Sequence, residues 1–127
     1  MSVAGVTHSE EIPVHELSGN RLRGLATPSR GSSDIAMWNH SVAPGAASPP
    51  HRHDHDQVIY VLSGEGRVVV GDDDFPVAAG DVIVAPAEIP HQVLAAPDQG
   101  LDTIVAMLTA LRTFRPDGSE IDQPWAR

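Results

Sequence analysis

Short apolar runs rich in β-branched residues, separated by turn residues, dominate the hydrophobic pattern of the chain. The clearest run, Gln57 to Leu62 (QVIYVL), ends at Ser63-Gly64, and a second run begins at Gly66. Eleven glycines and eleven prolines divide the chain into such pieces, which favours many short strands over long helices. The strands we expect are 35–42, 57–62, 66–70, 75–78, 82–85, 91–95 and 101–109.

The last of these runs, 101–109, has the length of a helix. We interpret it as a strand because it follows the turn 97–100 and contains several β-branched residues. Residues 46–50 are expected to form a loop, and the tail 112–127 to pair along an edge or to lie across a neighbour. Strands at this spacing predict an all-β sandwich or closed barrel, formed by a single domain over residues 1–127.

Alternation along the central run predicts which side chains face inward. Ile59 and Val61 share the parity of Gln57 and are expected to line the barrel, whereas Tyr60 faces the other way. Four other large apolar residues are predicted to lie in the core or the cavity wall: Met37, Trp38, Phe75 and Met107.

Composition limits the kinds of partner that the chain can bind and the donor atoms that a metal site can use. The formal net charge of −9 over 127 residues argues against a nucleic-acid or anionic membrane surface as partner. The absence of cysteine restricts any metal site to nitrogen and oxygen donors. No apolar stretch is long enough for a membrane helix, and the N-terminus lacks the pattern of a signal peptide, so we expect a cytoplasmic protein.

Three histidines fall within five residues, at His51, His53 and His55, and Gln57 follows with the same parity. In an extended chain all four could point to one face. Imidazole nitrogen binds zinc, iron, nickel and copper, and a further ligand must come from elsewhere in the sheet. His91 is the natural candidate because it opens a predicted strand. The alternative is a solvated polar loop whose histidines bind metal only adventitiously.

The spacing around these residues resembles the two sequence motifs of the cupin superfamily. The first motif is matched by Gly45, His51, His53, Gln57 and Gly64, and the second by Gly80, Pro86, Glu88 and His91. Three positions depart from the usual pattern, since Gln57 replaces a glutamate, Glu88 a glycine and Ala95 an asparagine. The two matches span residues 45–95.

The resemblance implies a cupin jelly-roll β-barrel that binds one divalent metal ion through His51, His53, His91 and Gln57. Zinc is the expected ion, with iron or nickel as alternatives. A neutral amide is a weaker donor than a carboxylate, and it leaves the site one charge more positive. The H-x-H-x-H-x-Q pattern also resembles cupins that open unsaturated uronate rings.

Two further histidines are candidates for a catalytic base. Strand parity puts His55 in the cavity, as another ligand or a proton acceptor, although a bulge would turn it out to solvent. His40 lies on the preceding predicted strand and could also face the cavity. His8 and His15 are expected at the surface, and Glu88 in a solvated loop or at the barrel mouth.

The function expected from the resemblance is enzymatic, on a small oxygenated substrate. The specific hypothesis is cyclisation of an aromatic polyketide, in which the metal stabilises an enolate and a nearby histidine moves protons. The alternatives are a non-haem dioxygenase of the quercetinase or diketone-cleaving type, a uronate ring-opening enzyme, and a non-catalytic small-molecule-binding cupin. A homodimer is expected, with Leu17, Leu22, Leu25 and the tail 111–127 near its interface.

Overall fold

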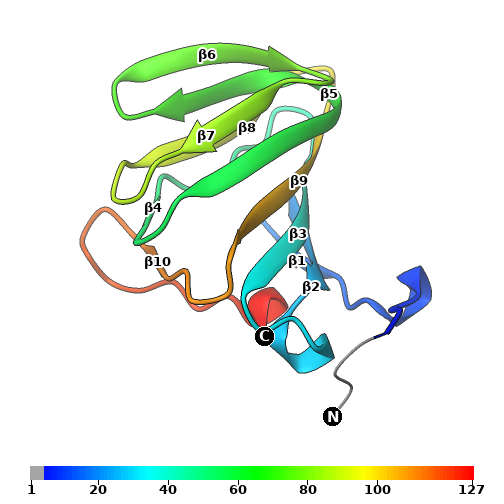
Figure 1. Ribbon diagram of the computed structural model, residues 1–127. Helices are drawn as coiled ribbons and strands as arrows, with labels where there is room; N and C mark the ends of the chain where they lie inside the picture. The colour runs from blue at the N-terminus through cyan, green and yellow to red at the C-terminus, as the bar shows by residue number, and fades with distance from the viewer. Residues whose placement is uncertain (1–4) are drawn as a thin grey trace.

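The computed structural model describes residues 5–127, which form β-strands joined by turns and by three single-turn 3-10 helices (Figure 1). The strands are β1 (His15–Leu17), β2 (Asn20–Ala26), β3 (Ile35–Val42), β4 (Arg52–His53), β5 (Gln57–Val70), β6 (Asp73–Ala78), β7 (Val82–Ala85), β8 (His91–Ala95), β9 (Leu101–Leu108) and β10 (Thr113–Phe114). The 3-10 helices are η1 (Ser9–Glu11), η2 (Pro28–Arg30) and η3 (Pro124–Ala126). Within this part of the chain, no helix has the length and apolar character needed to span a membrane.

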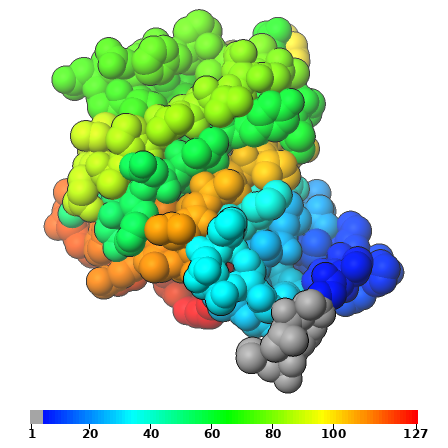
Figure 2. All heavy atoms as spheres, viewed as in Figure 1, coloured from blue at the N-terminus to red at the C-terminus, as the bar shows by residue number. Residues whose placement is uncertain are grey.

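The strands form two antiparallel layers whose inner faces share one core, which is the jelly-roll arrangement (Figure 1). One layer runs in the order β1, β2, β3, β9, β5, with β7 added on the far side of β5. The other is built on the second half of β5, which pairs with β6 and β8. In Figure 2, strands β7, β5, β9 and β3 are adjacent bands of yellow-green, green, orange and cyan.

Strand β5 is continuous where the sequence predicted two strands, 57–62 and 66–70. The register with β9 shifts between Val61 and Ser63, so the chain bulges and carries on instead of turning. Gly64 makes this possible, because its φ is 91° and a Cβ atom there would lie 1.7 Å from the Gly100 carbonyl oxygen. One strand therefore joins the two layers.

The other predicted strands agree closely with the structure. Strands β3, β7 and β8 have the predicted bounds, and β9 ends one residue before the predicted Thr109. Strand β6 begins at Asp73, two residues earlier than predicted. Strands β1 and β2 were not predicted, because two glycines interrupt their apolar pattern. The tail pairs with β4 through β10, in agreement with the expected edge pairing.

Burial follows the predicted parity in the centre of the chain. Ile59 is 2% exposed and Tyr60 is 44% exposed, so neighbouring residues of β5 face opposite sides. Trp38 and Met107 are buried in the core as predicted. The prediction is wrong for Met37 and Phe75, which are exposed. Met37 has the opposite parity to Trp38, and Phe75 lies on the edge strand β6, of which only Val77 is buried.

The C-terminal helix η3 closes one end of the barrel. Trp125 is buried and meets Trp38 edge to face, with ring centroids 6.0 Å apart. Its backbone lies so close to β2 that a Cβ atom on Gly24 would be 1.9 Å from the Trp125 carbonyl oxygen. The tail is therefore part of the cavity wall.

Candidate metal centre and its cavity

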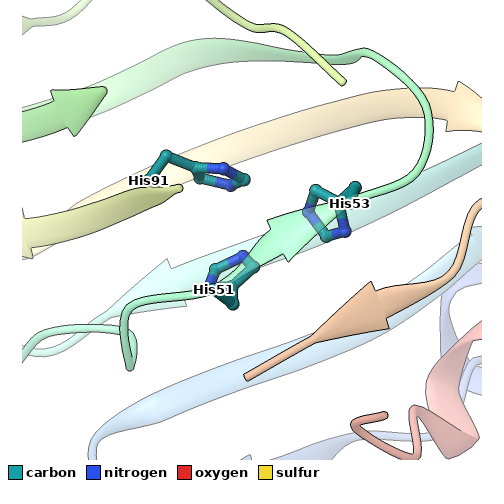
Figure 3. A group of neighbouring side chains, drawn as sticks. All are labelled: His51, His53 and His91. Carbon is teal, nitrogen blue, oxygen red and sulfur yellow. The ribbon is translucent and has the colours of Figure 1, made fainter. Parts of the chain in front are cut away.

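Three imidazoles converge inside the barrel, from His51, His53 and His91 (Figure 3). Their ligand-capable nitrogen atoms all lie within 4.8 Å of one another. Antiparallel pairing brings them together, because the His51 amide donates to the His91 carbonyl at 3.1 Å and the His91 amide donates back at 2.8 Å. These three residues, which the sequence predicted as ligands, could hold one metal ion.

Hydrogen bonds orient two of these rings. The Nδ1–H of His51 donates to the Pro49 carbonyl at 2.7 Å. The Nδ1 of His53 lies 2.7 Å from the Thr113 hydroxyl, which itself donates to the Gln123 amide oxygen at 2.8 Å. The Thr113 oxygen therefore accepts a hydrogen bond from the Nδ1–H of His53. The rings of His51 and His53 each keep an Nε2 lone pair for another partner.

A buried nitrogen without a partner supports metal binding at this point. Nε2 of His53 has no hydrogen-bond partner and is fully enclosed. Leaving a buried polar atom unpaired is costly, and a metal ion would satisfy it. In metal-binding histidines, the ring nitrogen that does not hold the metal commonly donates a hydrogen bond to a protein oxygen, as Nδ1 of His51 and of His53 does here. The donor set therefore fits a divalent ion that accepts imidazole.

The three histidines are held in the neutral form that metals bind. Burial is the largest cause, and it lowers the pKa of His53 to about 4 and that of His91 to about 3. It also lowers the pKa of His51, against an opposing effect of the Pro49 carbonyl. Because protons do not compete strongly for these rings near neutral pH, their lone pairs remain available.

Gln57 lies in the same cavity, at the start of β5. Its side chain is buried, its amide nitrogen lies 3.6 Å from the Met107 sulfur, and it lies close enough to His53 to oppose the lowering of the His53 pKa. The structure thus brings the fourth predicted ligand beside the three histidines.

His40 also lines this cavity, from β3. Its Nε2 lies 2.8 Å from the Asn20 amide oxygen. The amide nitrogen of Asn20 donates to the Ala47 carbonyl at 2.9 Å, so its oxygen faces His40 and accepts the Nε2 proton. Burial, reinforced by the nearby His51, lowers the pKa of His40 to about 4. His40 is therefore a neutral imidazole whose Nδ1 can accept a proton.

The parity expectation for His55 is not met. Strand β4 ends at His53, and the chain bends through the next residues. Asp54 fixes this bend, because its carboxylate accepts the Arg112 amide at 2.7 Å and lies 2.9 Å from His55 Nδ1. His55 is consequently more than a third exposed and lies outside the group of residues that line the cavity. The structure follows the alternative in which an irregularity turns it to solvent.

Glu88 takes the solvated position considered from the sequence. Its carboxylate is exposed and lies 3.7 Å from Arg52. Its φ of 68° is left-handed, which fits the family's usual glycine at this position. His15 is partly exposed, near the Trp125 ring. His8 is exposed, as expected.

The cavity around these groups has a volume of about 480 Å³, within the range of small-molecule sites. Much of its wall is apolar, including Leu22, Trp38, Ile59, Val93, Val105 and Trp125. Asn20, Thr113 and Gln123 also line it, and the sequence analysis did not single them out. These three residues belong to no sequence motif, and only tertiary packing brings them into the same cavity as the histidines. The spacing of residues along the sequence could therefore not have identified them.

Comparisons with known proteins identify the family to which the chain belongs. Residues 38–107 match the family model described as "Cupin domain". The pectin degradation protein KdgF of Dickeya dadantii is 33% identical over 87 residues, which cover 68% of this chain and 76% of that protein. Auxin-binding protein 1 of Arabidopsis thaliana is 29% identical over 84 residues, or 59% of this chain, which spans only 42% of that longer protein.

Solved structures with low sequence identity share the fold. The polyketide cyclase RemF from Streptomyces resistomycificus superposes with a TM-score of 0.75 at 22% identity, over 97% of this chain and 89% of RemF. A salicylate 1,2-dioxygenase from Pseudaminobacter salicylatoxidans superposes with a TM-score of 0.68 at 18% identity, over 80% of this chain and 31% of that one. With the motif match, the histidine cluster and the jelly roll in agreement, the chain belongs to the cupin domain family.

Proposed function

We propose that this protein is a metal-dependent enzyme that cyclises an aromatic polyketide. The observation that carries the proposal is the set of three neutral imidazoles in the wall of a largely apolar cavity of about 480 Å³. The full-length similarity to a polyketide cyclase supports the same choice, since the match covers 97% of this chain. A partly aromatic, uncharged substrate suits the two tryptophans in the wall.

The metal ligands in this proposal are His51, His53, His91 and the Gln57 amide oxygen. They are all neutral, so the charge of the bound ion is not reduced by its ligands. A divalent ion bound there supplies positive charge to a substrate oxygen on which negative charge develops. Zinc is the ion we expect first, with iron and nickel as alternatives.

His40 is the base in this proposal. Its Nε2–H donates a hydrogen bond to the Asn20 amide oxygen, which leaves the Nδ1 lone pair to take a proton from the acidic carbon between two substrate carbonyls. The resulting enolate carbon bonds to the carbon of a second carbonyl, whose oxygen takes this proton from His40 and becomes a hydroxyl group. Nδ1 then takes a second proton from the same substrate carbon and gives it to that hydroxyl, which leaves as water as the double bond forms. Trp38 and Trp125 pack against the aromatic part of the substrate and exclude water.

The test uses zinc-loaded protein under argon with an aromatic substrate that carries a 1,3-diketone side chain. Cyclised and dehydrated product, identified by mass spectrometry, is expected without oxygen. The variant His40→Asn is expected to slow turnover while keeping its metal. If turnover instead requires iron, copper or nickel together with oxygen, the dioxygenase hypothesis replaces this one.

A second candidate is the opening of unsaturated uronate rings. This candidate is supported by the sequence similarity to the pectin degradation protein KdgF and by the H-x-H-x-H-x-Q pattern. Against it, none of the described residues that line the cavity is a lysine or arginine that could bind the substrate carboxylate. Loss of the ultraviolet absorbance of a 4,5-unsaturated uronate in the presence of the protein would support this candidate.

A further inference from the structure

A side-chain amide of the C-terminal tail carries unused hydrogen-bond donors at the cavity wall. Gln123 comes just before η3 and lines the cavity together with Thr113 of β10, the pale orange strand beside His53 in Figure 3. Both residues lie beyond residues 38–107, the part of the chain that matches the cupin domain model. The two sequence motifs of the family therefore do not account for their contacts.

A chain of hydrogen bonds fixes how this amide is turned. Nε2 of His53 is the enclosed nitrogen without a partner, so Nδ1 carries the proton and donates a hydrogen bond to Thr113. The Thr113 hydroxyl is buried and has a single proton, which needs an acceptor. The Gln123 atom 2.8 Å from this hydroxyl is therefore the amide oxygen. The amide nitrogen consequently lies on the side away from Thr113.

The backbone around Gln123 is held in place. The Gln123 carbonyl accepts the Ala126 amide at 2.9 Å, which closes the single turn of η3. Two residues after Gln123, Trp125 is buried and its backbone packs against Gly24 of β2. A donor that is held in position before a ligand arrives loses less conformational entropy on binding. This rigidity suits Gln123 to recognition.

Two other amides of the same wall are already committed to the backbone. The Asn20 amide nitrogen donates to the Ala47 carbonyl at 2.9 Å, and the Gln92 amide nitrogen donates to the Ser48 carbonyl at 2.9 Å. By contrast, within residues 5–127 the hydrogen bond of the Gln123 side chain is the one that its oxygen accepts. Both protons of the Gln123 amide nitrogen are therefore left for a ligand or for water.

Other unpaired groups of the wall are donors as well. The indole nitrogens of Trp38 and Trp125 are enclosed and have no hydrogen-bond partner, and both residues line the cavity. A donor that is left without an acceptor when water is excluded is costly, and an oxygen atom of a ligand would satisfy it. These groups favour a ligand that carries oxygen acceptors in addition to the oxygen atoms that bind the metal.

We propose that Gln123 donates a hydrogen bond from its amide nitrogen to such a substrate oxygen. Gln123 thereby selects substrates that carry a carbonyl, ether or phenol oxygen on the aromatic part. This role rests on the proposed function, in which the diketone end of the substrate binds the metal. A site that donates a hydrogen bond to a substrate oxygen discriminates against the analogue that lacks it. For a bond between neutral groups the difference in affinity is about 3- to 10-fold.

The test compares two compounds that differ in one acceptor. Each is a 1-phenyl-1,3-butanedione whose ring carries either an acetyl group or an isopropenyl group of similar shape, at each ring position in turn. Isothermal titration calorimetry measures their affinities for protein saturated with zinc. The unmodified protein should bind the acetyl compound about 3- to 10-fold more tightly at one ring position, and Gln123→Leu should abolish this preference. Gln92→Leu is the matched control and should retain it, because the Gln92 amide bonds the Ser48 carbonyl.

Two results would overturn the proposal: an unmodified protein without the preference at any ring position, or a preference that survives in Gln123→Leu. If Gln123→Leu does not fold, Gln123→Glu replaces it, because a carboxylate still accepts the Thr113 hydroxyl and offers no N–H. The preference should again be lost. Since the readout is a ratio of two affinities at saturating zinc, a general effect on the metal site cancels.

Failure of the proposed function gives a different result. A protein that prefers the acetyl compound and forms no cyclised product would retain the role of Gln123 in binding and lose the proposed reaction. A protein that cyclises its substrate and binds the two compounds equally would retain the reaction and lose the role of Gln123.

Discussion

The two sides of the strands β3, β9, β5 and β7 have the same apolar character and different surroundings. Successive residues of β5 show it, since Val58 and Tyr60 point outward and Ile59 points inward. The inner side is covered within the protomer and also holds the polar groups of the site, among them His40 and Gln57. The outer side is apolar and exposed except at the end that holds the Asp102 carboxylate. An antiparallel sheet commonly packs one side on the core and leaves the other in water, so the apolar outer side departs from the usual alternation of apolar and polar residues.

The largest effect we expect is on the inner side. His91→Ala removes the imidazole that β8 contributes to the cluster, and the protein should lose most of its bound metal. Elemental analysis of the purified variant measures this directly. Full metal retention would show that the cluster is not the metal site.

The next prediction compares neighbouring residues on opposite sides of β5. Ile59→Ala should lower the free energy of unfolding by about 2–5 kcal/mol, because it leaves a cavity in the core. Val58→Ala should cost less than about 1 kcal/mol in a monomer, since its side chain is already partly exposed. Urea denaturation at submicromolar concentration measures both changes. Equal costs would contradict the distinction between the two sides.

A smaller effect is expected from the contact that orients His53. Thr113→Val removes the hydroxyl that accepts the His53 Nδ1 proton, and the affinity for zinc should fall about 10- to 100-fold. Competition with a coloured chelator measures the affinity. Thr109→Val is the control, because its hydroxyl bonds the Ser33 carbonyl and is not part of the cavity wall. An unchanged affinity in Thr113→Val would leave the hydroxyl without a role in the site.

The smallest effect is expected at His55. His55→Asn should leave metal content unchanged and alter the free energy of unfolding by less than about 0.5 kcal/mol, since the side chain is partly solvated and its hydrogen bond is to the neighbouring Asp54. Elemental analysis and urea denaturation are the measurements. Loss of metal in this variant would return His55 to the set of ligands.

Much of the site could be predicted because it obeys local rules. Gln57 and Ile59 lie on one regular strand, so their parity held, and the motif spacing located His91 at the start of β8. His55 failed because parity applies only while the chain stays extended, and the Asp54 carboxylate bends it immediately after His53. The Thr113 hydroxyl joins His53 from 60 positions along the chain, a contact that depends on how the tail packs and leaves no periodic trace.

The continuity of β5 also bears on how the protein folds. Strand β5 forms backbone pairs in both layers, so neither layer can be completed unless the other also forms. We therefore expect the domain to unfold in a single cooperative transition. The histidine cluster depends on the same closure, since it joins residues 51–53 to residue 91 across a wide loop of chain. Such long-range pairing costs loop-closure entropy before the contacts that stabilise the fold can form. This predicts folding on the slow timescale of β-sandwich topologies.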